Sequence, residues 1–167
     1  LPEDVFRVRN YKKPHPERSH NYICGLYKDA VEFKSSRWFH YLGRELYYKK
    51  YWSAAIRVFQ KGISCPGGWN TERSQGMCYT GECWQQLGDL DKAVSAFMKA
   101  IDYDSERREP WIRLAWIYQA KGNVWAALAF TNACELFKKR VDLYENDHNY
   151  TTYPKQLRDW CINKLKV

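Results

Sequence analysis

One pattern of small and packing residues occurs three times along this chain, and it restricts the fold more than any other feature. Each copy has a small residue, an alanine twelve positions later, and packing residues sixteen and nineteen positions after the small one. The three copies read Gly43, Ala55, Phe59 and Gly62; Gly81, Ala93, Phe97 and Ala100; and Ala115, Ala127, Thr131 and Cys134. The recurring alanines are 38 and 34 residues apart. Self-similarity at such a period is typical of repeat proteins, in which each unit packs on its neighbours.

Each copy is predicted to form two antiparallel helices. In the first copy, apolar residues follow helical spacing on both sides of a break near Lys49–Trp52. In the later copies the break contains Gly88 and Gly122, which can adopt the left-handed conformation that ends a helix. Asp89 and Asn123 can then cap the helix that follows. The small residues allow the paired helices to cross closely. We therefore expect helix pairs over residues 36–64, 74–103 and 108–138, each bound being approximate.

The sequence between the first two copies contains an insertion, "ISCPGGWNTERSQ". Its proline and glycines are expected to end one helix, and Asn70 or Thr71 to cap the next. Repeat proteins tolerate such insertions as loops on one face.

The two ends of the chain carry further predicted elements. Residues 16–34 and 154–165 have the apolar spacing of capping helices, opened by Pro16 and Pro154. Val5–Tyr11 alternates apolar and basic residues and is predicted to be a short strand. A lone strand is not stable by itself. Since the chain also begins at Leu1 and not at Met, we expect residues 1–15 to be a strand and linker from an upstream domain, and residues 16–167 to be the helical repeat domain.

Charge and composition limit the function classes. The net charge is +8, and 17% of the residues are aromatic. Two readings stay open: attraction to polyanions such as nucleic acid, or a solvated surface, which the even spread of Lys and Arg favours. No run of 18 apolar residues exists, so no membrane span is expected. Six cysteines without a C-x-x-C pair favour free thiols in a reducing cytoplasm over disulfides or zinc.

The sequence lacks the motifs of common catalytic centres. It contains no G-x-S-x-G, no P-loop and no H-E-x-x-H. His148 lies in "ENDHN", but adjacent Glu, Asp and His side chains in a loop point in different directions and make a poor metal site. We expect no catalytic residue, no metal and no cofactor.

The repeat pattern resembles a known family. An aromatic–Leu–Gly, Ala, Phe, Ala pattern at roughly 34-residue spacing is similar to the tetratricopeptide repeat (TPR) over about residues 36–138. The resemblance implies an all-α superhelix of antiparallel helix pairs, with about three repeats and flanking capping helices. It also implies that the first helix of each pair lines a concave groove.

The groove predicted from this register carries amides, charges of both signs and aromatic rings. Such groups suit a peptide or a carbohydrate ligand. The candidate partner-binding residues are His40, Arg44, Tyr47, Tyr48, Glu82, Gln85, Gln86, Trp116 and Gln119, with Cys78 and Ile112 on the same faces. TPR grooves that clasp a C-terminal carboxylate use Lys, Asn and Arg. Here the comparable positions hold His40, Arg44 and Glu82. We therefore do not expect the groove to bind a C-terminal carboxylate in this way.

A second resemblance covers most of the chain. The phrases "YLGRE", "PGGW" and "REPW" are similar to the TPR region that follows the catalytic domain of family 2 glycosyltransferases in bacteria and their phages. No nucleotide-sugar domain and no D-x-D motif on a strand end are present. The resemblance implies a non-catalytic accessory module that binds an acceptor polypeptide, a glycan or a second copy. Two alternatives stay open: a stand-alone protein adaptor and a basic nucleic-acid-binding repeat.

Overall fold

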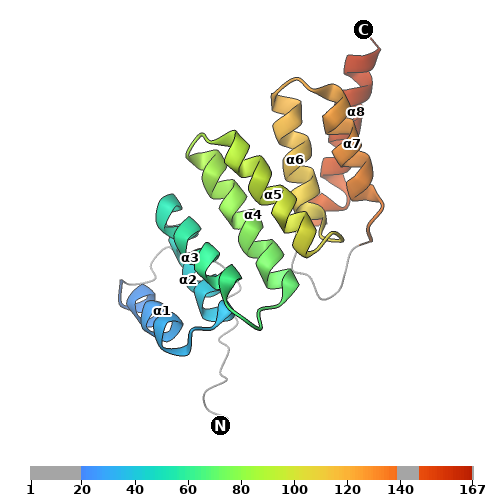
Figure 1. Ribbon diagram of the computed structural model, residues 1–167. Helices are drawn as coiled ribbons and strands as arrows, with labels where there is room; N and C mark the ends of the chain where they lie inside the picture. The colour runs from blue at the N-terminus through green and yellow to red at the C-terminus, as the bar shows by residue number, and fades with distance from the viewer. Residues whose placement is uncertain (1–19, 139–146, 167) are drawn as a thin grey trace.

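The computed structural model of the protein describes residues 20–138 and 147–166. This part of the chain is helical throughout, apart from its turns and loops (Figure 1). The α-helices are α1 (His20–Phe33), α2 (Ser36–Tyr48), α3 (Trp52–Ser64), α4 (Asn70–Gln86), α5 (Leu90–Tyr103), α6 (Arg108–Ala120), α7 (Val124–Glu135) and α8 (Thr152–Leu165), with a 3-10 turn, η2 (Asp147–Asn149), before α8. The predicted strand at Val5–Tyr11 lies outside the described residues.

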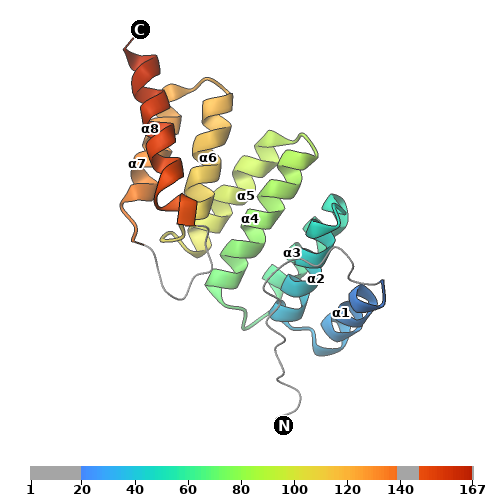
Figure 2. The same ribbon diagram turned by 180° about the vertical axis from the view of Figure 1, so that it is seen from behind.

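The helices form a stack of antiparallel pairs, as the two opposite views show (Figures 1 and 2). α2 pairs with α3, α4 with α5, and α6 with α7, while α1 packs on α2 and α8 packs on α7. First helices also touch each other, α2 against α4 and α6 against α8. In the described residues the second helices α3, α5 and α7 make no comparable contacts with one another. α2 and α4 therefore lie on the inner side of the stack, and the Glu82–Arg113 ion pair connects that side to α6.

The turns within all three pairs lie where the sequence predicts them, and glycine forms two of the three. Gly88 and Gly122 have φ of 82° and 72°, and both end a helix in the left-handed conformation. The Asp89 side chain accepts a hydrogen bond from the Lys92 amide, and Asn123 does the same for Ala126. In the first pair no glycine is available, and Lys50 takes the left-handed conformation with φ of 64°.

The start of α4 differs from the prediction. The helix begins at Asn70, and the residue at the cap position is Trp69, which makes no side-chain capping bond. The Thr71 hydroxyl does not cap the helix because it donates to the Asp104 carboxylate, 3.2 Å away, beyond the end of α5. The predicted caps at Asn70 and Thr71 are therefore wrong, and the first turn of α4 instead ties two repeats together.

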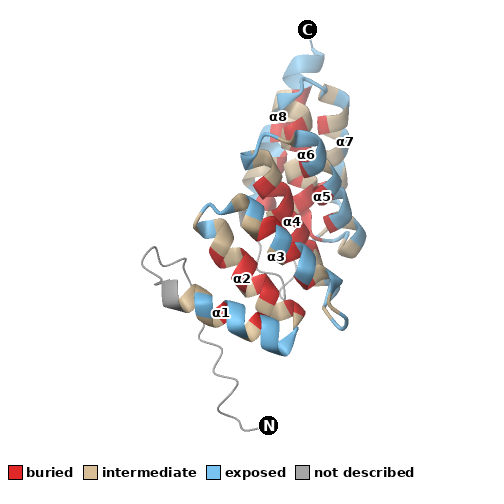
Figure 3. Ribbon diagram, turned by 60° about the vertical axis from the view of Figure 1, so that its left-hand side comes forward, coloured by how far each residue is buried: buried red, intermediate tan, exposed pale blue. Residues whose placement is uncertain are grey.

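Close helix crossing explains the small residues of the repeat. A Cβ atom at Gly43 would lie 2.6 Å from the Phe59 ring, and one at Gly81 would lie 2.7 Å from the Phe97 ring. These distances are below any normal contact, so only glycine fits. In the third pair the equivalent repeat positions hold Ala115 and Thr131, and both residues are fully buried. The buried residues at these crossings run through the middle of the stack (Figure 3).

Close helix crossing does not require glycine at position 76 in α4. A Cβ atom there would make ordinary contacts of 3.5 Å and 3.6 Å with Ile63 and Phe59. Because glycine weakens a helix interior, Gly76→Ala should raise the free energy of unfolding by about 0.5–1 kcal/mol, measured by urea denaturation. The control is Gly43→Ala, which should lower it. A stabilising effect of both substitutions would contradict the close-crossing explanation.

Candidate binding face on the first helices

The candidate site lies on the surface of α2, α4 and α6 that the repeat register places on the inner side of the stack. We call this surface the inner face. It is made of residues that recur at equivalent positions of the three first helices: Arg37, His40, Tyr41, Arg44, Tyr47 and Tyr48 on α2; Gln75, Cys78, Tyr79, Glu82, Gln85 and Gln86 on α4; and Glu109, Ile112, Arg113, Trp116 and Gln119 on α6.

One carboxylate links all three first helices. The Glu82 side chain, on α4, is only 8% exposed as a residue. The Tyr47 hydroxyl of α2 donates to Glu82 Oε2 at 2.5 Å, and Arg113 of α6 forms an ion pair with Oε1. Burial raises the pKa of Glu82, and Arg113 opposes that effect. Because a half-buried ion pair with a charged hydrogen bond holds its partners in fixed directions, this bridge makes the inner face rigid.

Aromatic rings cover the inner face between α2 and α4. The Tyr47 and Tyr79 ring centroids lie 4.9 Å apart, and Tyr47 also contacts Trp52 and Tyr48. Burial raises the pKa of Tyr47 and of Tyr79 well above the ordinary value, so both hydroxyls stay neutral. Tyr48 is 39% exposed. In this cluster the Tyr48 ring is therefore accessible to a ligand, and it packs on the Tyr47 ring, which neighbouring rings hold in place.

His40 is a buried part of this surface and not a free ligand group. The residue is 7% exposed, and its ring lies against the rings of Phe59 and Tyr79, with centroids 5.8 Å and 6.2 Å away. Burial, followed by the charges of Arg44 and Arg107, lowers the His40 pKa to about 3. The imidazole is therefore neutral at physiological pH.

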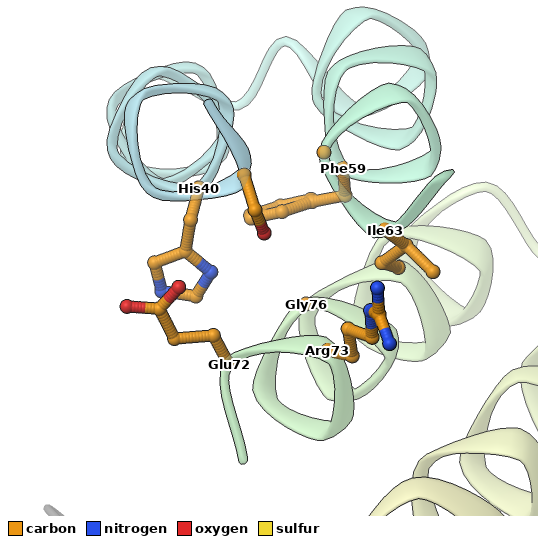
Figure 4. A pocket seen from close by; sticks show the side chains of 8 residues that line it. His40, Phe59, Ile63, Glu72, Arg73 and Gly76 are labelled. Atoms are coloured by element: carbon orange, nitrogen blue, oxygen red, sulfur yellow. The ribbon is translucent and has the colours of Figure 1, made fainter. Parts of the chain in front are cut away.

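A small cavity borders His40 where α2, α3 and α4 meet (Figure 4). His40 enters it from α2, Phe59 and Ile63 from α3, and Glu72, Arg73 and Gly76 from α4. Its volume is about 10 Å³, which is room for about one water molecule. It is too small for a peptide side chain or a sugar, so we place the candidate site on the open inner face.

The inner face continues onto α6 and α8. Arg113 lies over the Trp116 ring at 5.3 Å, and Trp116 meets Tyr153 of α8 edge to face at 4.8 Å. The Tyr153 ring also contacts His148, at a centroid distance of 5.4 Å. This end of the surface is therefore half-buried, aromatic and polar.

The predicted site residues divide into three groups by their exposure to solvent. His40, Cys78, Glu82 and Ile112 are buried. Arg44, Tyr47, Gln85, Trp116 and Gln119 are half-buried, while Tyr48 and Gln86 are exposed. Which of them contact a partner stays a prediction. Sequence reasoning missed Tyr79, Arg113 and Tyr153, although the first two stand at one repeat position, with Tyr41 as the third member.

No protein-family model matches the chain, and no curated protein matches it. Solved structures do. MamA matches with a TM-score of 0.60 at 22% identity over 67% of this chain, and this chain spans 64% of MamA, less than two thirds. The Yersinia enterocolitica type III secretion chaperone SycD, solved with a peptide of the translocator YopD, matches with a TM-score of 0.64 at 16% identity, over 82% of this chain and 95% of SycD. The TPR2AB domain of yeast Sti1, in a complex with pHSP90, matches with a TM-score of 0.56 at 18% identity, over 85% of this chain and 54% of that one.

The fold is a TPR superhelix.

The phrases that gave the narrower resemblance have structural roles in this TPR fold. In "REPW", the Arg108 guanidinium donates to the Phe137 carbonyl, with Nε at 2.6 Å, and Trp111 Nε1 donates to the Ser105 carbonyl. In "PGGW", Gly67 has φ of 74°, and Trp69 lies 4.9 Å from the Arg37 guanidinium. These groups stabilise loops and helix ends.

The helices and the cysteines were also examined for membrane-span character and for disulfides. None of the described helices has the length and apolar character that a membrane span requires. All six cysteines are free thiols. Burial raises the pKa of Cys83 to about 12, which leaves that thiol protonated and unreactive.

Proposed function

We propose that this TPR module is a non-catalytic scaffold that binds an extended segment of a partner protein on its inner face. The observation that carries the proposal is the bridge of Tyr47, Glu82 and Arg113, which holds three helices and leaves accessible aromatic and amide groups beside it. Tyr48, Gln86, Gln119 and Trp116 are the accessible or half-buried groups. A preorganised surface of this kind loses little entropy when it binds a flexible chain.

The comparisons support this assignment indirectly. SycD was solved with a peptide of YopD, and the Sti1 domain was solved in a complex with pHSP90. At 16% and 18% identity these likenesses concern the fold, and the use of the inner face is our inference. Six free thiols support a reducing compartment such as the cytoplasm as the place of action.

The test is selection of random peptides on the immobilised protein, followed by affinity measurement of the selected peptides. Trp116→Ala should weaken binding roughly tenfold or more, because aromatic contacts dominate such interfaces. The matched control is Trp125→Ala, which removes a 70%-exposed tryptophan from α7, outside the inner face. Circular dichroism checks the fold of each variant.

A second pair of variants keeps the test valid if Trp116→Ala fails to fold. Tyr48→Ala should weaken binding, while Tyr51→Ala, in the turn after α2, should not. Equal losses within each pair, or no selected peptide at all, would refute the proposed function.

We also keep the parent enzyme as a proposal: the module serves as the C-terminal accessory part of a family 2 glycosyltransferase and presents a polypeptide or glycan acceptor, or joins two copies. Its support is the sequence resemblance alone. The deciding observation is the reading frame upstream of Leu1. A nucleotide-sugar domain there supports the proposal, and an unrelated domain removes it.

A further inference from the structure

The arginines of the inner helices differ in their bonding. On α2, α4 and α6, Arg37 pairs with Glu72, and Arg113 pairs with Glu82. Arg73 donates to the Cys65 carbonyl, and Arg108 donates to the Phe137 carbonyl. Within the described residues Arg44 has neither a hydrogen bond nor a carboxylate within ion-pair distance, and its contact is the face of the Tyr41 ring, 5.9 Å away.

Arg44 is not an ordinary solvated arginine. Its Nε is buried and has no hydrogen-bond partner in the described part of the chain. A buried donor without an acceptor costs about 1–3 kcal/mol, and more when it is charged. Arg73 Nε is buried without a partner as well, but the guanidinium of Arg73 donates to the Cys65 carbonyl through Nη2. Arg44 as a residue is half-buried, so a ligand would bind the terminal nitrogens of its guanidinium and not the closed Nε.

Arg44 lacks a carboxylate partner among the described residues, whereas the arginines around it have one: Arg37 pairs with Glu72, and Arg107 pairs with Glu109. The charge of Arg44, together with those of Arg107 and Arg37, lowers the pKa of the neighbouring His40. Arg44 stands at the same repeat position as Glu82 and Trp116, the two residues that bridge the first helices. An anion placed beside Arg44 would therefore lie on the inner face, next to an arginine that no carboxylate of the described residues neutralises.

We propose that Arg44 binds the side-chain carboxylate of an acidic residue in an extended partner segment that crosses the inner face. This inference rests on the proposed function. An internal side chain fits better than a chain end, since groups that can contact a segment continue on both sides of Arg44, toward Arg37 at the start of α2 and toward Tyr48 at its end. Tyr48 supplies an exposed ring for an apolar neighbour of that acidic residue.

The probe is a random copolymer of glutamate and tyrosine, titrated into the protein at physiological salt and followed by isothermal calorimetry. We expect binding that Arg44→Gln weakens roughly tenfold or more, because a charge-assisted hydrogen bond contributes at that level. The matched control is Arg57→Gln. Arg57 is exposed on α3, so this variant loses the same charge from outside the inner face and should bind as the natural chain does. Arg44→Lys should give an intermediate loss, because lysine keeps the charge but lacks the planar fork.

Several outcomes overturn the inference. Equal losses in Arg44→Gln and Arg57→Gln would show unspecific attraction to a basic protein. Equal or tighter binding of a lysine–tyrosine copolymer would show that the carboxylate is irrelevant. Arg44-dependent binding of single-stranded DNA in place of the copolymer would assign the surface to nucleic acid.

The failures of the two proposals can be told apart. If the selected peptides bind through Trp116 but contain no acidic residue and are indifferent to Arg44→Gln, the proposed function stands and the Arg44 inference is wrong. If no peptide binds and the copolymer does not bind either, both are wrong.

Discussion

Replacing Phe97 by alanine should lower the free energy of unfolding by about 3–5 kcal/mol, the usual cost of removing a fully buried phenylalanine. Phe97 is 0% exposed and lies in the core cluster that joins α4, α5 and α6. Its ring fills the space that Gly81 leaves open on α4. Urea denaturation followed by circular dichroism measures the change. A loss below 1 kcal/mol would contradict the packing at this crossing.

A double-mutant cycle isolates the contact between the two residues. In the natural background Gly81→Ala should be destabilising, because the added Cβ would lie 2.7 Å from the ring. In the Phe97→Ala background the same change should stabilise, since the ring is gone and alanine favours a helix. Additive effects would show that the ring and the glycine do not meet.

Acid should destabilise the protein through His40. The folded pKa is about 3, below the ordinary value of 6.5, because the ring is buried among arginine charges. The unfolded chain therefore binds a proton that the folded chain rejects. The stability from this group is complete above pH 6.5 and is lost as the pH falls toward 3. At pH 4.5 the loss should be about 2–3 kcal/mol relative to neutral pH.

The readout is a comparison of slopes. The His40→Gln variant has no titrating group at position 40. Its free energy of unfolding should therefore fall less steeply between pH 6.5 and pH 4.5 than that of the natural chain. This difference is independent of the variant's stability at neutral pH. Parallel curves would mean that the folded chain binds a proton at His40 as readily as the unfolded chain does.

The architecture could be predicted from the sequence because each repeat packs its two helices through residues at equivalent positions. Glycine at Gly43 and Gly81 faces phenylalanine at the same offset, and the left-handed glycines and their capping neighbours mark two of the turns. These signals are local or strictly periodic. They are therefore visible without a structure.

The chemistry of the inner face was predictable only in part. The repeat register placed Arg44, Glu82 and Trp116 on one face, but it did not show which charges pair. Tyr47 and Glu82 are 35 residues apart and stand at different repeat positions, and the pairing depends on side-chain conformation. The hydrogen bonds of Arg108 could not be predicted either, because the acceptors are backbone carbonyls at the end of another helix.

The most direct test of the account maps where a selected peptide binds. Amide NMR spectra of the labelled protein, recorded while a peptide from the selection is added, report on each helix separately. We expect shifts concentrated on α2, α4 and α6, including residues around Arg44, Tyr48 and Trp116. Shifts concentrated on α3, α5 and α7 would contradict it.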